Sequence, residues 1–398
     1  MARSFMYSTE EKRVMRKFGF KRMKDIHRIT WGDAVDKGKM TTPEEIRKDM
    51  RFLAETEQDK IIVWRTLFRD HKAKWFNIAD QSIYKTTIPQ HRLMMAYFNN
   101  IERMFASQGD LNKVAIDAIH EGGMEAWHWG DGLFDNFAPP SVLYQGMTPF
   151  AWEAKLQTQN PGICRMDRFG RPQYGVWEYR YPEAREFTIQ RLVEEVNAYS
   201  FDGMMLSTRT HSVPALDGEQ YGYNDVVDDE LKLRTGLSFN DPQYWRNPNA
   251  HETRRRILGE SVTLFLRDLR KAWPKGKKLV IGIPRTDYWG PPYGNVFIDW
   301  RVWVEEKLVD GLYLDDLSGK ALYYPAIVDD QYHDYLADEE AGIGLRPYIY
   351  DLEHVFGPAC AEAGAELLVY RDAKSVVQAV YGGEYRPRLE RGEAEQIE

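Results

Sequence analysis

Amphipathic segments alternate with short apolar runs along most of the chain, and residues 181–212 give the clearest example. Pro182 suits the first position of a helix, where its missing N–H costs nothing. Apolar residues then recur at the spacing of one helix face: Ile189, Leu192, Val193 and Val196. Asp202-Gly203 ends this period and precedes an apolar run at 204–206. The pattern predicts a helix, a tight turn and a buried strand that ends in polar residues.

The same unit recurs along the chain. Residues 310–316 repeat the Asp-Gly turn, the apolar run and the polar end at the offsets seen in 202–208. Thr42-Pro43-Glu44-Glu45 predicts a capped helix start. Strands are expected at 25–32, 61–68, 124–129, 204–206, 278–284, 312–316, 346–354 and 365–372. Helices are expected at 43–54, 89–104, 114–119, 182–196, 252–273, 299–308 and 325–342.

Helices that alternate with short apolar strands favour a parallel α/β fold. Eight strands would close a (β/α)8 TIM barrel, with long βα loops at 136–180 and 212–250. An open doubly wound sheet is disfavoured because the chain has no glycine-rich phosphate turn. We therefore predict one barrel domain over residues 1–398, with an irregular segment at about 1–40 and a frayed tail at about 383–398.

Composition narrows the class of protein. The net charge of -8 argues against a nucleic-acid partner, for which a basic face would be expected. Two cysteines, Cys164 and Cys360, exclude a disulfide framework and a cysteine-rich zinc site, and leave a single disulfide open. No apolar run approaches the length of a membrane helix. The start lacks the apolar region of a secretory signal, so we expect a cytoplasmic protein, or an exported one whose signal was trimmed. A homo-oligomer stays possible.

Aromatic residues make up 13% of the chain, with 12 Trp and 23 Tyr. Ring faces stack on the apolar C–H faces of sugars, so this content suits a carbohydrate partner; a large aromatic core would explain it equally well.

Polar residues gather where the expected strands end, and in a (β/α)8 barrel these ends form the site of chemistry. The candidates are Arg65, Trp129, Asp131, Arg209, His211, Asp287, Trp289, Asp315, Asp316, Asp351, Glu353, Arg371 and Asp372. Carboxylates around one pocket can provide a proton donor and a nucleophile or base, as glycosidic bond hydrolysis requires. No nucleophile elbow and no H-E-x-x-H motif is present.

We expect Asp315, Glu353 and Asp287 to be catalytic. Asp315 is preferred over Asp316 because alternation along a strand points only one of two neighbours inward. Asp351 lies on the same side of its strand as Glu353 and is an alternative. The competing reading for these carboxylates is a salt bridge or a loop cap. Asp202 and Asp310 are expected to be turn residues.

Substrate binding is expected from the remaining strand-end residues: Arg65, Trp129, Asp131, Arg209, His211, Trp289 and Arg371. Arg209 could contact a carboxylate or sulfate on a sugar, or pair with an Asp of a neighbouring strand. His211 could act as an acid or base, or be structural. A metal site formed by Asp131, His211, Asp287 and Asp315 is a third possibility, although we expect no cofactor.

Several segments of the sequence, taken together, resemble those of a known protein family. PEAREFTIQRLVEEVNAYSFDGMMLSTRTHS, followed by YGYND, ESVTLFLRDLRKAWP, KLVIGIP, DWRVWVEEKLVDGLYLD and AELLVY, resembles the glycoside-hydrolase-like TIM-barrel proteins of bacteria, often described as family-10-like glycosyl hydrolases. The resemblance covers about residues 110–375. It implies a barrel that acts on, or binds, a poly- or oligosaccharide at the carboxyl ends of its strands. Such proteins commonly have an acidic residue where this chain has Ser207-Thr208-Arg209.

Three functions are therefore open. The leading hypothesis is a glycoside hydrolase. The alternatives are a carbohydrate-binding barrel without hydrolysis, which the missing carboxylate favours, and a metal-dependent barrel hydrolase or isomerase.

Overall fold

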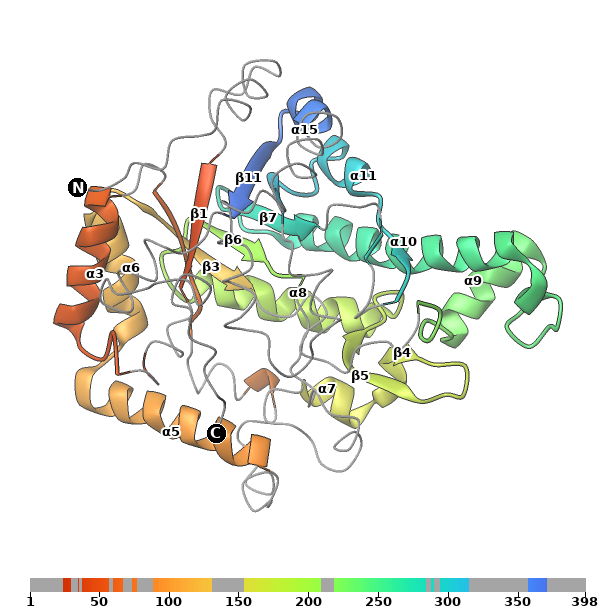
Figure 1. Ribbon diagram of the computed structural model, residues 1–398, viewed down its shortest axis with the longest axis horizontal. Helices are drawn as coiled ribbons and strands as arrows, with labels where there is room; N and C mark the ends of the chain where they lie inside the picture. The colour runs from red at the N-terminus through yellow and green to blue at the C-terminus, as the bar shows by residue number, and fades with distance from the viewer. Residues whose placement is uncertain are drawn as a thin grey trace, which may run out of the picture.

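The computed structural model (Figure 1) describes the ranges 24–29, 38–56, 60–66, 74–76, 89–130, 154–208, 218–283, 288–289, 294–314 and 357–370, together with residue 35.

Seven parallel strands form the centre of the described structure. They are β1 (Lys24–Ile29), β2 (Ile61–Trp64), β3 (Glu125–Gly130), β6 (Gly203–Leu206), β7 (Lys278–Ile283), β10 (Gly311–Leu314) and β11 (Glu366–Tyr370). They pair in the order β1-β11-β10-β7-β6-β3-β2, and β1 also pairs with β2, so the hydrogen bonding returns to its start. We call this closed order the ring.

The apolar residues of the ring separate into two clusters. The outer cluster includes Met204, Leu206, Leu279 and Ile281 together with helix residues such as Leu192. The inner cluster consists of Ile61, Val63, Trp127, Trp129, Met205, Val280 and Tyr313. Because successive side chains of a strand point to opposite faces, strand residues that do not pack with the helices face the inside of the ring.

Helices cover the outside of the ring. They are α3 (Pro43–Thr56), α5 (Pro89–Gln108), α6 (Leu111–Glu121), α8 (Pro182–Asn197), α10 (Pro248–Ala272), α11 (Trp300–Glu305) and α15 (Gly357–Ala363). The predicted capping box of α3 is present: Thr42 Oγ1 accepts from Glu45 N at 3.2 Å, and Glu45 Oε2 accepts from Thr41 N at 2.8 Å.

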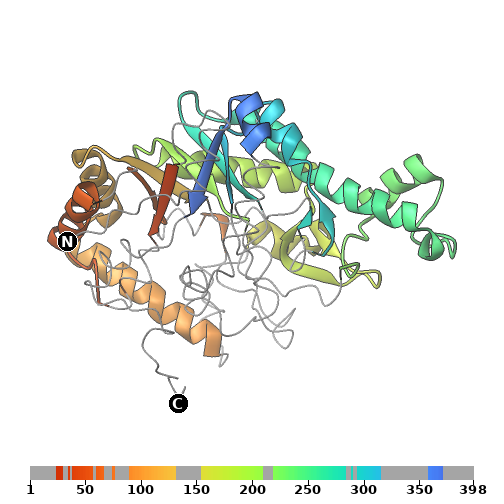
Figure 2. The same cartoon turned by 45° about the horizontal axis from the view of Figure 1, so that its top comes forward.

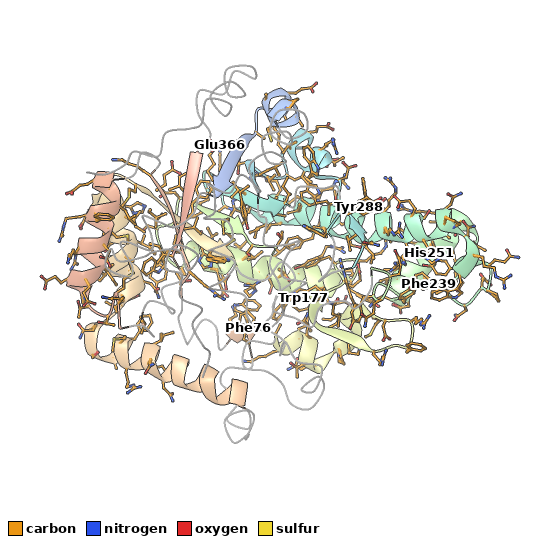
Figure 3. All side chains as sticks on the ribbon, in the orientation of Figure 1. Phe76, Trp177, Phe239, His251, Tyr288 and Glu366 are labelled. Atoms are coloured by element: carbon orange, nitrogen blue, oxygen red, sulfur yellow. The ribbon has the colours of Figure 1, made fainter. Side chains whose placement is uncertain are left out.

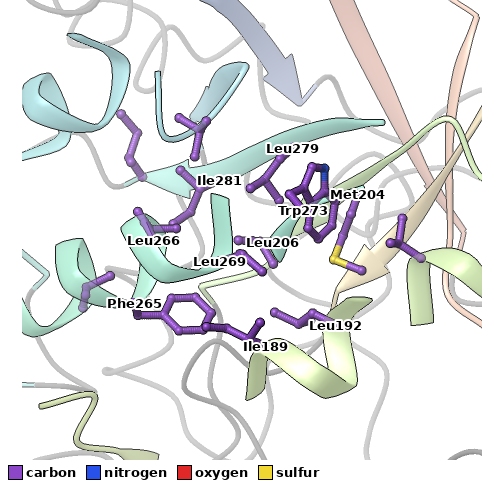
Figure 4. Close-up of a cluster of buried hydrophobic side chains, with 14 of the residues drawn as sticks. Ile189, Leu192, Met204, Leu206, Phe265, Leu266, Leu269, Trp273, Leu279 and Ile281 are labelled. Carbon is purple, nitrogen blue, oxygen red and sulfur yellow. The ribbon is translucent and has the colours of Figure 1, made fainter. Parts of the chain in front are cut away.

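Helices α8 and α10 pack on β6 and β7 through a continuous apolar layer. Figure 4 shows Ile189 and Leu192 of α8 and Phe265 and Leu269 of α10 pointing toward Leu206 and its neighbours on the strands. Leu192, Leu206, Phe265 and Leu269 are fully buried, and burial of such a side chain stabilises the fold by roughly 1.5–3 kcal/mol. The helical spacing of apolar residues in 182–196 thus produces the expected core face.

The two Asp-Gly turns, at 202–203 and 310–311, have the same structure at the amino ends of two strands. Asp202 Oδ2 accepts from Ala126 N at 2.9 Å, and Asp310 Oδ2 accepts from Leu279 N at 2.8 Å. In each case the acceptor precedes a strand and the donor lies on the preceding strand of the ring. A Cβ at Gly203 or Gly311 would lie 2.8 or 2.7 Å from a backbone oxygen of the next strand. Both Asp residues are therefore turn residues at the end of the ring away from the expected site.

The two long predicted loops contain regular structure, so that part of the prediction was wrong. Residues 154–177 form α7 (Lys155–Gln159), a 3-10 turn η4 (Pro161–Ile163) and the hairpin β4 (Cys164–Met166) with β5 (Pro172–Trp177). Residues 225–246 form α9 (Asp225–Thr235) and η5 (Tyr244–Arg246). A further small hairpin joins β8 (Tyr288–Trp289) to β9 (Val296–Phe297).

We call residues 154–181 and 218–251 the side lobe. Asn224 joins its two segments, donating to Cys164 O at 2.7 Å and accepting from Met166 N at 3.0 Å. The lobe packs along α10, through contacts such as the Tyr179–Phe265 stack at 4.4 Å. Figure 2 shows β4, β5 and α9 at the end of α10 that lies away from β1 and β11.

The prediction of a parallel α/β fold is confirmed. The described strands close into a ring of seven, in which β10 pairs directly with β11, and the eight-strand barrel stays a prediction. The expected helix at 325–342 and strand at 346–354 lie outside the described residues. Cys164 and Cys360 are both buried, and neither takes part in a disulfide bond. Within the described ranges, no helix is both long and apolar enough to cross a membrane. The single-domain organisation stays a prediction.

Candidate functional site

The carboxyl ends of the seven parallel strands meet at one end of the ring. Arg65 and Thr66 follow β2, and Ser207 and Thr208 follow β6. Backbone bonds keep these residues in the ring's register: Arg65 N donates to Ile29 O and Ser207 N donates to Gly130 O, each at 3.0 Å. The strand pairing therefore continues one residue beyond the apolar runs, and it fixes polar residues at this end.

Two of the predicted substrate-binding residues lie together at this end. Trp64 pairs with His128, so Arg65 comes opposite Trp129 one register step further on. The Arg65 guanidinium lies 5.5 Å from the centroid of the Trp129 ring, within the range of a cation–π contact. Arg65 is half-buried and Trp129 is 5% exposed. The Arg65 cation thus lies over the Trp129 indole on the inner side of the ring of strands.

Below this pair the ring is filled with apolar side chains. Trp127, Met205, Val280 and Tyr313 of the inner cluster are at most 1% exposed. Tyr313 lies across from Gly282, where a Cβ would come within 2.6 Å of the phenol ring. Glycine at 282 thus leaves the space that the tyrosine ring occupies. These residues therefore leave the ring interior filled at the level of the inner cluster.

A buried polar network lies on the outer side of the same strand ends. Thr66 Oγ1 is 3.4 Å from His128 Nδ1, and His128 Nε2 is 3.3 Å from Glu195 Oε2. Arg191 Nη1 donates to both Glu195 oxygens at 3.1 and 3.2 Å. Thr66, His128, Arg191 and Glu195 are at most 1% exposed. The network joins the ends of β2 and β3 to α8 and holds the backbone that carries Arg65 and Trp129.

Sequence reasoning missed this network. Glu195 lies on the apolar face of α8, three residues after Leu192. Because a buried carboxylate is almost always paired, this position could have indicated a buried ion pair. Its partner His128 is 67 residues away in the chain, and it faces outward because it lies between the inward Trp127 and Trp129. Neither feature identifies the partner without the fold.

A second buried ion pair supports the side lobe. Arg165 of β4 and Glu178 are 1% and 0% exposed, with 3.8 Å between Arg165 Nε and Glu178 Oε2. Glu178 Oε1 also accepts from Arg180 N at 3.1 Å. Burial raises the pKa of the neighbouring Tyr179 well above its ordinary value, so its phenol stays protonated. These groups fix the path of the chain from the hairpin into α8.

Most of the predicted site residues lie outside the described part of the chain: Asp131, Arg209, His211, Asp287, Asp315, Glu353 and Arg371. Their roles stay predictions. Trp289 is described and lies in the β8–β9 hairpin. It is fully buried, with its ring centroid 6.0 Å from that of Trp303, so burial gives no support to the expected stacking on a sugar.

Among the described residues, no group of three or more His, Cys, Asp or Glu side chains is arranged to hold a metal ion. The four residues of the predicted metal site all lie outside those ranges. The described strand ends thus carry a guanidinium and an indole, together with the hydroxyls of Thr66, Ser207 and Thr208.

No model of a known protein family matches the chain, and no curated protein matches it. The family-10-like assignment therefore stays an expectation. Among solved structures, the chain aligns with a family 36 α-galactosidase from Geobacillus stearothermophilus at 10% identity, with a TM-score of 0.39, covering 91% of this chain and 41% of that enzyme.

Two further structures align at similar levels. One is the galactosidase domain of an α-galactosidase–sucrose kinase, at 12% identity and a TM-score of 0.33, covering 85% of this chain and 37% of the other. The other is a maltogenic α-amylase from Thermotoga neapolitana, at 16% identity and a TM-score of 0.19, covering 53% and 50%. The chain spans less than half of the two galactosidase chains. With every TM-score below 0.5, the fold description rests on the strand pairing itself.

Proposed function

We propose that the protein is a glycoside hydrolase that binds a poly- or oligosaccharide at the carboxyl end of its ring. The observation that carries this proposal is the Arg65–Trp129 pair, which places a cation and an aromatic ring together on the inner side of that end. The half-buried Arg65 guanidinium can bind the hydroxyl or acidic groups of a sugar, and the buried Trp129 indole beneath it fixes its position. In this reading the ring is a variant of the (β/α)8 barrel, whose sites lie at this end.

Catalysis would come from the carboxylates that follow the strands. Asp315 comes directly after the last residue of β10. Leu312 belongs to the outer cluster and Tyr313 to the inner one, so continued alternation would turn position 315 inward. Glu353 or Asp287 would be the second carboxylate. One carboxylic acid would protonate the leaving oxygen while the other carboxylate attacks the anomeric carbon or activates water.

Separate amide substitutions test these roles. We expect Asp315→Asn and Glu353→Gln each to lower kcat at least about a hundredfold on the best substrate of a glycan panel, because an amide can neither donate the proton nor act as the nucleophile. Asp287→Asn is measured alongside them. The readout is release of reducing ends under saturating substrate.

Asp117→Asn, on the exposed face of α6, is the matched control and should leave turnover unchanged. Undiminished turnover in both Asp315→Asn and Glu353→Gln would exclude this assignment of the catalytic pair. Arg65→Gln should raise KM more than it lowers kcat if Arg65 binds substrate throughout the reaction.

A second candidate, a carbohydrate-binding barrel without hydrolysis, is favoured by one observation. The residues that follow β6 are Ser207 and Thr208, and both are buried, so this strand end has no carboxylate at those positions. Calorimetry separates the two functions: glycan binding that Arg65→Gln weakens, with no product after prolonged incubation, would favour the binder.

A further inference from the structure

The side lobe contains a hollow that no part of the proposed hydrolytic site uses. It has a volume of about 290 Å³ and lies between the β4–β5 turn and the segments around Glu219 and Trp245. Arg168, Phe169 and Arg171 line one side, and Glu219, Tyr223 and Trp245 line the other. A hollow of this size can hold part of a small ligand.

Two of its walls are exposed aromatic rings. Phe169 is 67% exposed and Trp245 is 41% exposed. The described residues include one further exposed large apolar side chain, Leu233 of α9, which lies outside the hollow. The Trp245 ring stacks on Tyr223 at 5.7 Å with 25° between the planes, and this contact fixes its orientation. The hollow therefore offers held aromatic faces, as a sugar-binding site requires.

Arg168 lies between these two rings. Its guanidinium is 4.7 Å from the Phe169 centroid and 5.8 Å from the Trp245 centroid. The adjacent Asp167 instead binds Arg171, at 2.6 Å from Nε, and accepts from the backbone N–H groups of Phe169 and Arg171. Among the described residues, no carboxylate lies within ion-pair distance of Arg168. A charged, exposed guanidinium is thus held in place and available to a ligand.

The second carboxylate of the hollow is neutralised. Glu219 accepts from Arg254, from Arg255 Nε at 2.8 Å and from Asn295 at 3.2 Å. Burial opposes ionisation of Glu219, but the charge of Arg254 and the bonds from Arg255 and Asn295 outweigh it and lower its pKa. Glu219 therefore stays ionised and paired, and the positive charge of Arg168 determines the character of the hollow.

We propose that this hollow is a second carbohydrate site, which binds a pyranose ring carrying a negative group, either a carboxylate or a sulfate. The aromatic faces would stack on the sugar ring while Arg168 binds the anion. The assignment to sugars rests on the proposed function, whereas the preference for an anion rests on the hollow alone.

The hollow has a lining of its own, which contains neither Arg65 nor Trp129. It lies beside the first turns of α10, where Arg254 and Arg255 bind Glu219 of the hollow. Figure 3 shows Phe239 and His251 of this region on one side of the molecule and Glu366, the first residue of β11, on the other. An oligosaccharide held here would be anchored by residues other than those proposed for the reacting bond.

Isothermal titration calorimetry on the full chain tests the proposal with three ligands: an oligogalacturonate, a sulfated galactan oligosaccharide and a neutral galactan oligosaccharide of the same length. We expect one of the anionic ligands to bind and the neutral one to bind at least about tenfold more weakly. Arg168→Gln should remove the preference for the anion, and Phe169→Ala should weaken binding of the anionic ligand about tenfold.

Two controls match these changes. Arg47→Gln removes an exposed arginine on α3, and Leu233→Ala removes the exposed apolar side chain outside the hollow. Both should bind like the wild type, and thermal unfolding of each variant checks that the lobe stays folded. Equal binding of the neutral ligand, no binding of either anionic ligand, or binding by Arg168→Gln equal to the wild type would overturn the proposal.

The same samples distinguish this proposal from the hydrolytic one. Asp315→Asn should lose turnover and keep binding at the hollow, whereas Arg168→Gln should keep turnover on a short neutral substrate. Turnover without anion-selective binding would overturn the second site alone. Anion-selective binding that Arg168→Gln abolishes, without turnover on any glycan, would sustain the second site and contradict the hydrolase.

Discussion

Two of the pairs in which an arginine lies over a tryptophan, Arg65–Trp129 and Arg168–Trp245, have different surroundings. Arg65 is 5.5 Å from the Trp129 ring, and Arg168 is 5.8 Å from the Trp245 ring. Trp129 is 5% exposed and packs in the inner cluster, whereas Trp245 is 41% exposed. The same contact is therefore built into the core of the ring in one place and left open to solvent in the other.

The comparison shows that burial, more than the type of contact, determines what each pair can do. Trp129 and the strands that carry it are fixed by the register of the ring and by the network from Thr66 to Arg191. Trp245 is held by Tyr223 and by one hydrogen bond from its Nε1 to Phe239 O at 3.1 Å. We expect the first pair to be sensitive to any change of shape, and the second to tolerate substitutions that alter only binding.

The largest expected difference comes from truncating the two indoles. Trp129→Ala should lower the free energy of unfolding by about 3–5 kcal/mol, because it leaves a cavity among the rigid strands of the ring. Trp245→Ala should cost about 1–2 kcal/mol, because much of its ring is already in water. Denaturant unfolding of both variants measures the difference. Equal losses would show that the two environments do not differ as described.

A smaller difference is expected from the carboxylates that support the two pairs. Glu195→Gln should destabilise the protein by about 3 kcal/mol, because it leaves the buried Arg191 without its charge partner. Glu219→Gln should cost less, about 1–2 kcal/mol, because Glu219 is 29% exposed and its buried partner Arg254 keeps a hydrogen bond to Tyr221 O. Adding salt should reduce the second loss and leave the first nearly unchanged. A similar salt dependence for both would contradict the distinction.

The smallest effect is a pH dependence at the hollow. The pKa of Glu219 is lowered in the folded protein, so its contribution is complete above the ordinary pKa of 4.5 and is lost as the pH falls through the folded pKa. The stability difference between the wild type and Glu219→Gln should therefore be constant from about pH 7 to 5.5 and shrink below about pH 4.5. Glu44→Gln, on the exposed side of α3, serves as the control. A difference that grows on acidification would reverse the assigned direction.

Local patterns in the sequence predicted the elements of the ring well. The Asp-Gly turns at 202 and 310, the capping box before α3 and the apolar face of α8 each depend on residues within a few positions of one another. Such features depend on the geometry of residues that are close in the chain, so a short window of sequence is enough to predict them. The same reasoning placed Arg65 and Trp129 near strand ends, although the strand expected at 61–68 ends at Trp64 and Trp129 lies inside β3.

Features that depend on distant residues could not be predicted in the same way. The closing of the ring with seven strands is a property of the β10–β11 and β1–β11 pairing, which no local pattern encodes. The contact of His128 with Glu195 and the hollow around Arg168 both join segments that are far apart in the chain. Helix α9 was missed because Asp and Gly near its ends resemble a loop, while its apolar Val227 and Leu231 form only a narrow stripe.

A structure with a bound, non-hydrolysable oligosaccharide tests the central claim most directly. We expect a sugar at the carboxyl ends of the strands, in contact with the Arg65 guanidinium, with Asp315 and a second carboxylate on either side of the glycosidic bond. Density for sugar in the hollow beside Arg168 but none at the strand ends, under conditions in which product is formed, would contradict the account.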